Sequence, residues 1–208
     1  MNVDHIHWLG HASFRIEDGK NQIYIDPWKL SEGSPKADVI LVTHGHYDHL
    51  SLEDIERIET PETVFVAPAD VVEQLGKRKV IKATAGGTYT AGTVTVEATP
   101  SYNLGKPFHG KEKGWLGYVV TLSNGQRIYH AGDTDDIPEM ASVRADVALM
   151  PCGGTYTMTA AEMAEAANRF MPSVLIPMHW GDIVGSKADA ETVARSFGGK
   201  TVIRPIEK

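Results

Sequence analysis

Short apolar runs separated by turn residues dominate the first half of the chain. Residues 5–9, 12–16 and 22–25 are rich in β-branched and aromatic side chains, which is typical of strands. Asp18-Gly19 lies between the second and third of these runs and predicts a turn. Residues 39–42 form an uninterrupted apolar run, as expected of a strand buried on both faces. The pattern therefore predicts a β-rich first half that contains one deeply buried strand.

Capping residues mark the expected helices. Residues 52–58 follow Ser51, and Asp54 three positions after that serine gives a weak capping-box match. Residues 159–170 begin at Thr159, and Glu162 completes the clearest capping box in the chain. Two more helices are expected, each followed by a glycine, at residues 68–75 and 188–197. Further strands are expected at residues 63–67, 80–83, 93–98, 115–122, 127–131, 147–150, 174–176 and 201–206.

These elements predict one domain that spans residues 1–208. No repeat, low-complexity tract or linker divides the mixed strands and helices, so we expect an α/β or α+β fold. Asn124-Gly125 separates two expected strands and predicts a type I′ hairpin turn. Residues 100–114 form a long irregular connection with two prolines and three glycines. Loops of this length in compact domains are often functional, so we expect residues 100–114 to form part of a functional site.

Composition and charge limit the classes of partner. The 208 residues include 27 acidic and 20 basic side chains, so the formal net charge is −7. This charge argues against nucleic acid and anionic membranes as partners, because both attract a positive surface. No apolar run approaches the ~18 residues of a membrane span, and the first residues lack the pattern of a secretory leader. We expect a cytoplasmic protein that acts on a small molecule, with homo-oligomerisation left open.

Histidine is the candidate metal ligand in this chain. One cysteine excludes a cysteine-rich zinc site, whereas nine histidines leave a histidine-rich site open. His44, His46, Asp48 and His49 lie within six residues, directly after the expected buried strand. Imidazoles with a carboxylate suit Zn²⁺ and similar divalent ions. Side chains crowded in this way need a compensating charge, so we predict a metal site at the end of this strand.

These residues match the H-x-H-x-D-H signature of the metallo-β-lactamase superfamily of metal-dependent hydrolases, which the chain resembles over almost its whole length. Residues 8–13 (WLGHAS), 25–28 (IDPW) and 128–134 (IYHAGDT) resemble recurring segments of the branch that includes ascorbate-phosphate lactonases. The resemblance implies an α+β fold, namely a single-domain, four-layer αββα sandwich. It also implies a metal site at one edge, between the two sheets.

The resemblance further implies two divalent metal ions and their ligands. In the family, the first two signature histidines and a third histidine hold one ion. The signature aspartate, the last signature histidine and a late histidine hold the other, and a further aspartate bridges both. Asp133 matches the bridging aspartate and His179 the late histidine; His109 takes the remaining position because no other histidine lies between His49 and His130. The expected ligands are His44, His46, Asp48, His49, His109, Asp133 and His179. Zn²⁺ is the expected ion, with Mn²⁺, Fe²⁺ or Ni²⁺ as alternatives.

Two histidines outside this set have open roles. His11 could line the pocket, donate a proton, orient a ligand or pack, and His130 could support Asp133 or pack in the sheet. We expect catalytic roles for Asp48, which orients the attacking hydroxide or relays its proton, and for His11 as a candidate acid.

Hydrolysis is the chemistry that this site predicts. Two divalent cations that bridge a water lower its pKa from 15.7 towards ~7, which creates a hydroxide at neutral pH. Esters, lactones and phosphodiesters suit this nucleophile. We expect a small anionic substrate. Lys106, Lys111 and Lys113 either recognise its phosphate or carboxylate or belong to a solvated, mobile loop, which the sequence slightly favours. The alternatives are an iron-dependent oxidoreductase similar to sulfur dioxygenases and a non-catalytic metal-binding scaffold.

Overall fold

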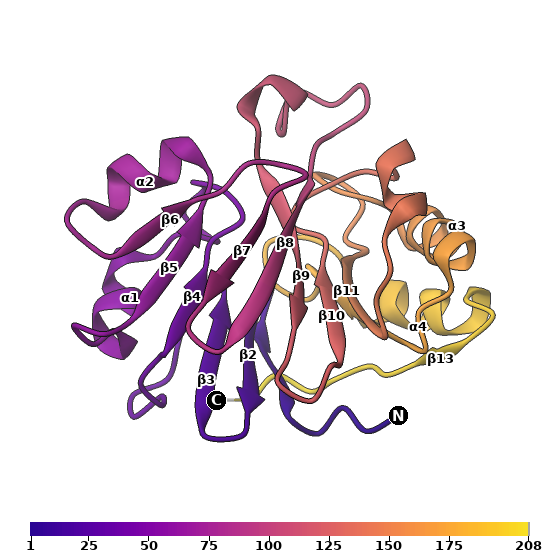
Figure 1. Cartoon of the computed structure of the whole chain (residues 1–208). Helices are drawn as coiled ribbons and strands as arrows, with labels where there is room; N and C mark the ends of the chain where they lie inside the picture. Colours follow the sequence, from indigo (N-terminus) through magenta and orange to yellow (C-terminus); the bar gives the residue numbers. More distant parts are fainter. Residues whose placement is uncertain (208) are drawn as a thin grey trace.

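Two β-sheets packed face to face form the centre of the computed structural model, which describes residues 1–207 (Figure 1). The first sheet contains, in spatial order, β1 (Ile6–Gly10), β2 (Ser13–Asp18), β3 (Asn21–Ile25), β4 (Val39–Leu41), β5 (Val64–Ala67) and β6 (Val80–Lys82). The second contains β13 (Lys200–Thr201), β12 (Val174–Met178), β11 (Val147–Pro151), β10 (Arg127–His130), β9 (Leu116–Thr121), β8 (Val94–Pro100) and β7 (Thr88–Ala91). The helices are α1 (Leu52–Ile58), α2 (Ala69–Leu75), α3 (Ala160–Phe170) and α4 (Lys187–Ser196), with short 3₁₀ turns η1 (Lys111–Lys113) and η2 (Pro138–Ser142).

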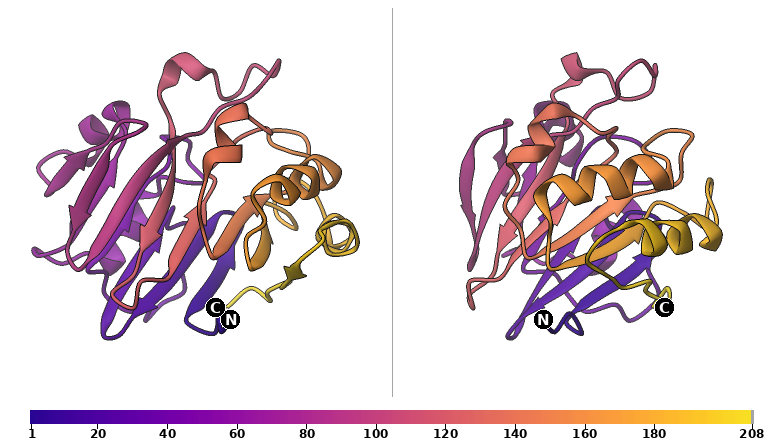
Figure 2. Two further views of the ribbon diagram at one scale, coloured as in Figure 1. Left: turned by 45° about the vertical axis from the view of Figure 1, so that its right-hand side comes forward. Right: turned by 90° about the vertical axis from the view of Figure 1, so that its right-hand side faces the viewer.

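Helices cover the outer face of each sheet and complete four layers. On the first sheet, α1 and α2 bury Ile55 and Val71 in one apolar cluster with Ile40 of β4. On the second sheet, α3 and α4 lie against each other on the face that points away from the first sheet (Figure 2). Leu41 of β4 points the other way, into the larger cluster between the sheets, so this short strand is buried on both faces as predicted. The predicted αββα sandwich is confirmed.

The strand directions bring the predicted site loops to one edge of the sandwich. Strands β3 to β6 run parallel in the first sheet, and β10 to β13 run parallel in the second. The carboxyl ends of parallel strands lie at one edge of a sheet, where open α/β sheets form their crevices. The connection between β8 and β9 rises above the two sheets at this edge, at the top of Figure 1. Among residues 1–207, no helix is long and apolar enough to cross a lipid bilayer.

Hydrogen bonds between the two sheets hold this edge together. The buried Tyr118 hydroxyl donates to the Val42 carbonyl over 2.7 Å, and the Leu116 N–H donates to the Thr43 carbonyl over 3.1 Å. The His130 Nδ1 accepts from the Gly132 N–H, so its Nε2 carries the proton and donates to the Ala12 carbonyl over 2.8 Å. His130 therefore packs as a neutral imidazole that ties the sheets together, which was one of its two predicted roles.

Two of the predicted helix starts, those of α1 and α3, are confirmed in detail. The Ser51 hydroxyl accepts from the Asp54 N–H over 3.2 Å at the start of α1. At the start of α3, Thr159 and Glu162 form both bonds of the capping box. Local sequence determines these features, because each cap bonds to backbone only three residues away.

Two strands differ from the prediction. Strand β7 was not predicted, because its threonines Thr88 and Thr90 are exposed and show no apolar alternation. The last strand, predicted at residues 201–206, ends at Thr201. Beyond it the chain crosses to the first sheet, where the Glu207 N–H donates to the Trp8 carbonyl over 2.8 Å. The apolar residues at 202 and 203 therefore pack against the core and do not continue the strand.

The predicted type I′ turn is also wrong. That turn requires a positive φ at both central residues, whereas only Gly125 of Asn124-Gly125 has one, at 84°. A hydrogen bond from the Leu122 N–H to the Gln126 carbonyl closes a three-residue loop instead, with glycine at its left-handed position.

Candidate metal centre

The structure brings together all seven predicted metal ligands. Four lie in the loop after β4, and one each in the loops after β8, β10 and β12. Three overlapping groups have ligand atoms within 4.8 Å of one another: His44, His46 and His109; His44, His49 and Asp133; and His11, Asp48, His49 and His179. We call these eight residues the histidine–aspartate cluster. Its eighth member, His11, was predicted near the site but outside the ligand set.

Asp133 lies at the centre of the cluster and is only 4% exposed. Its Oδ2 lies 3.0 Å from the His179 Nε2 and 3.3 Å from the His109 Nε2. Burial opposes the charge of this carboxyl, but His179 and His49 outweigh burial and hold its pKa well below the usual value. The carboxylate is therefore anionic, and it attracts positive charge to the centre of the cluster.

The donor atoms of the cluster fit a metal ion. Buried polar atoms in proteins almost always have a hydrogen-bond partner. Here the Nε2 atoms of His49, His109 and His179 and the Oδ1 of Asp133 are buried without one, and they converge on the same space. Burial also lowers the pKa of His44 well below its usual value, so this imidazole is neutral, the form that binds metals. Imidazole nitrogen and carboxylate oxygen suit divalent ions, so the cluster could bind metal ions.

A buried network orients His49. The Asp26 Oδ2 lies 2.7 Å from the His49 Nδ1 and accepts from the Thr43 hydroxyl over 2.6 Å. The Asp26 Oδ1 accepts from the Thr43 N–H over 2.7 Å. With Nδ1 engaged, the Nε2 of His49 faces the cluster. Burial lowers the pKa of His49, but Asp133 and Asp26 outweigh it and raise this pKa well above the usual value. Asp26 had no predicted role, because only the fold brings it to His49.

Asn103 and Trp115 support the first group of ligands. The Asn103 Oδ1 lies 3.0 Å from the His109 Nδ1 and accepts from the His109 N–H over 3.1 Å. This bond turns the His109 Nε2 towards Asp133, as the ligand role requires. The Trp115 ring lies 4.8 Å from the rings of both His44 and His46 and closes their outer side. Neither residue was predicted, and no spacing in the sequence indicates them.

His11 lies behind Asp48. The His11 Nε2 is 3.0 Å from the Asp48 Oδ2, and the ring is 1% exposed. Burial lowers the pKa of His11, although the bond to Asp48 opposes this shift. A neutral ring that uses its Nε2–H on Asp48 orients that carboxylate, so among the four predicted roles of His11 the geometry favours orientation.

Backbone strain gathers at this edge. Among the described residues, six other than glycine have a positive φ, and four of them are His11 (50°), Asp26 (48°), His179 (59°) and Ile183 (60°). Such conformations cost free energy and persist where the surrounding structure holds them, most often at functional sites. The cluster is therefore assembled at a conformational cost that a packing role alone does not explain.

The loop lysines are engaged by acidic partners. The Lys106 Nζ lies 2.5 Å from the Asp135 Oδ1 and donates to the Thr157 carbonyl over 2.8 Å. The Lys111 Nζ lies 3.0 Å from the Glu139 Oε1. Lys113 is exposed on η1. The first two lysines therefore hold the loop 101–114 in place, and their charge is already matched.

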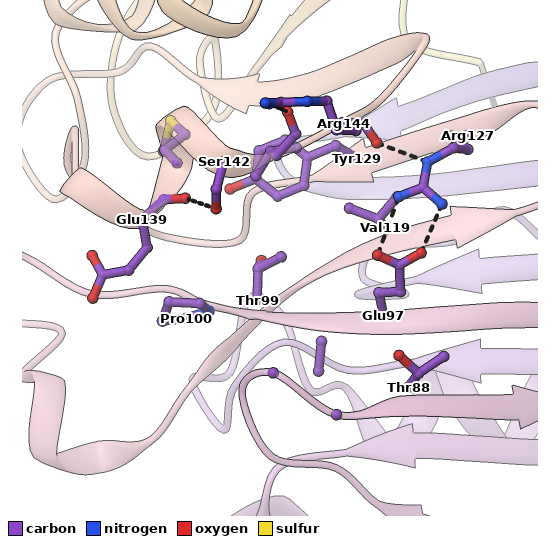
Figure 3. Close-up of a pocket in the computed structure, with 15 residues that line it drawn as sticks. Thr88, Glu97, Thr99, Pro100, Val119, Arg127, Tyr129, Glu139, Ser142 and Arg144 are labelled. Atoms are coloured by element: carbon purple, nitrogen blue, oxygen red, sulfur yellow. Dashed lines mark hydrogen bonds and ion pairs between the residues drawn. The ribbon is translucent and has the colours of Figure 1, made fainter.

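Two cavities differ in whether residues of the cluster line them. A cavity of about 240 Å³ is lined by His46, Asp48, His109, Asp133 and His179 together with apolar side chains. A larger cavity of about 340 Å³ lies over the outer face of β8 to β10 (Figure 3). There Arg127 pairs with Glu97 through both carboxylate oxygens, and no histidine or cysteine lines the cavity. The smaller cavity is therefore the candidate site.

Comparison with known proteins identifies the family of the chain. Residues 5–179 match the family described as the beta-lactamase superfamily domain. A UPF0173 metal-dependent hydrolase from Thermoplasma acidophilum is 34% identical, over 97% of this chain and 95% of the relative. Another from Koribacter versatilis is 32% identical, over 85% and 84%. A protein from Parabacteroides distasonis, thought to be a metal-dependent hydrolase, is 34% identical. Its crystal structure superposes on this chain with a TM-score of 0.85, and the match covers 97% of this chain and 93% of that one. A metallo hydrolase from Ignicoccus hospitalis shares the fold, with a TM-score of 0.80 at 24% identity over 98% and 95%.

The support that Asp26 gives to His49 predicts a metal-affinity defect. We expect Asp26→Asn to lower the metal affinity about 10–100-fold, because a partner that orients a ligand is lost. Competition with a chelator of known affinity measures this change. Asp18→Asn is the control: Asp18 is 5% exposed and accepts from the Ser123 N–H, far along the chain from every ligand. An equal loss in both variants would mean that Asp26 acts only through stability.

Proposed function

The chain belongs to the UPF0173 metal-dependent hydrolases of the beta-lactamase superfamily, and we propose that it uses two divalent ions, with zinc as the first expectation, to hydrolyse an ester, lactone or phosphodiester of a small molecule. One observation carries this proposal: buried imidazole nitrogens without partners surround an anionic carboxylate in a cavity open to solvent. Such a site attracts cations and admits a substrate to them. No other cavity described above combines these features.

The proposed ligands divide into two sets that share Asp133. His44, His46 and His109 would hold one ion, and Asp48, His49 and His179 the other. Two observations support this division: the first three form one group of adjacent ligand atoms and the second three belong to another. Asp133 lies within 3.4 Å of a nitrogen from each set. When bound, such ions lower the pKa of a water from 15.7 towards ~7 and polarise the attacked oxygen.

Asp48 is the proton carrier in this proposal. Its side chain is 13% exposed and lines the cavity, where it can accept the proton of the attacking water. The water oxygen forms a bond to carbon or phosphorus, the bond from that atom to the leaving oxygen breaks, and the proton held by Asp48 passes to the leaving oxygen. His11 does not reach the cavity and acts as a positioning residue, through its 3.0 Å contact with Asp48.

Metal content and a substrate screen test this function. We expect about two divalent ions per chain in protein purified without added metal, and turnover in a screen of lactones, esters and phosphodiesters. His109→Ala should retain about one ion and lose most activity, because one ion loses its third imidazole. His5→Ala, which changes a histidine outside the cluster, should retain both ions. Fewer than one ion per chain, without rescue by added divalent ions, would contradict the proposal.

The positioning role of His11 predicts a specific kinetic pattern. We expect His11→Leu, assayed with metal in excess so that both sites stay filled, to lower kcat about 10–100-fold with KM unchanged, because Asp48 loses the donor that orients it. His11→Gln has a similar volume and keeps an N–H that can reach Asp48, so it should recover much of the lost kcat. Steady-state kinetics of both variants, with metal analysis, measure this difference. Equal defects in both would show that the ring is needed for packing or as a ligand.

A further inference from the structure

Four of the nine residues that line the 240 Å³ cavity are large aromatic or aliphatic side chains. They are Tyr47, Phe108, Tyr156 and Ile183, which we call the apolar wall. The four residues come from four segments: the loops that follow β4, β8, β11 and β12. None of the nine residues that line the cavity is a lysine or an arginine. The cavity therefore combines the candidate metal centre with a surface that offers no cation to a substrate.

Three of the four residues of the apolar wall are exposed although they are large. Tyr47 is 68% exposed, Ile183 44% and Phe108 40%, and these are three of the eight large apolar residues exposed in the described chain. Exposed apolar side chains scattered singly need no explanation, whereas a group around one cavity indicates a binding surface. The gathering of three such residues at the metal centre therefore points to an apolar ligand.

Packing holds the aromatic members of the wall in place. The rings of Phe108 and Tyr156 meet edge to face at 4.8 Å, and the Asn103 amide donates to the Tyr156 carbonyl over 2.9 Å. Tyr47 meets the Trp28 ring edge to face at 6.1 Å. The wall is thus preorganised from separate loops, which reduces the entropy that a ligand must remove on binding.

Ile183 is held at the cavity by a strained turn. Its φ of 60° lies in the left-handed region, where a β-branched residue is an outlier. The Val184 N–H donates to the Asp182 carbonyl over 2.6 Å across this residue, and Lys29 anchors Asp182 over 2.6 Å. Glycine would adopt this turn without strain, and yet the position carries a half-exposed isoleucine. The strain is explained if the side chain serves a contact at the cavity.

We propose that the substrate carries a neutral apolar group, an aryl or branched alkyl group, which packs on the apolar wall beside the bond to be broken. This inference rests on the proposed hydrolase function and replaces the expected anionic substrate, since the charges of Lys106 and Lys111 are matched by Asp135 and Glu139. Typical small-molecule pockets measure ~300–1,000 Å³. A cavity of 240 Å³ therefore suits one group the size of an aromatic ring.

Paired phosphonates test the apolar wall without requiring turnover. Benzylphosphonate and methylphosphonate offer the metal centre the same acid group and differ in the apolar part. Titration calorimetry on the metal-loaded protein should show at least about tenfold tighter binding of the benzyl compound, the scale on which apolar pockets discriminate. Phe108→Ala and Ile183→Gly should reduce this preference to a few-fold. Ile183→Gly removes the side chain and also relieves the strained turn, so the variant retains its fold.

Leu52→Ala is the matched control, because Leu52 is as exposed as Phe108 but does not line the cavity. It should leave the preference unchanged. Equal affinity for the two phosphonates, no binding of either, or an unchanged preference in both wall variants overturns the inference. A benzyl preference without hydrolysis of any ester, lactone or phosphodiester overturns the proposed function and leaves the apolar wall standing. Hydrolysis without a benzyl preference overturns the apolar wall and leaves the proposed function standing.

Discussion

The buried carboxylate of Asp133 needs positive charge around it, and the edge where the two sheets meet is organised to meet this need. A charge that is removed from water is tolerated only when it is paired. Three imidazole nitrogens lie within 3.4 Å of this carboxylate, and each is buried without a hydrogen-bond partner. A cation between them satisfies the carboxylate and the nitrogens together. The site loops, their supporting bonds and the strained residues all serve this one arrangement.

Precision in the cluster comes from residues that do not belong to it. Asp26 and Asn103 engage the Nδ1 atoms of His49 and His109, which leaves the Nε2 atoms of both rings facing Asp133. The Tyr118 hydroxyl bonds to Val42 of the first sheet from the second sheet, just before the signature histidines. Because the two sheets carry different ligands, a shift of one sheet against the other would separate them. The bonds across the sheets therefore protect the geometry of the cluster.

Local signals in the sequence were sufficient for the elements that depend on near neighbours. The caps of α1 and α3, the buried strand β4 and the dense signature after it could all be read directly. His109 could be assigned because the chain offered no competing histidine in that region. The role of Asp26, the pairing of Lys106 with Asp135 and the turn at Ile183 depend on contacts between segments far apart in the chain. No spacing or periodicity encodes such contacts.

The central claim is that the cluster is built around cations. Comparing the unfolding of the metal-free and the metal-loaded protein tests this claim most directly. The free energy of unfolding is measured by urea titration after chelator treatment and again after reloading with zinc. If the cluster holds metal, zinc at ~1,000 times its Kd should raise this free energy by about 4 kcal/mol, because the folded state alone has the assembled site. Identical unfolding curves with and without metal would contradict the account, since Asp133 and its imidazoles would then be stable without a cation.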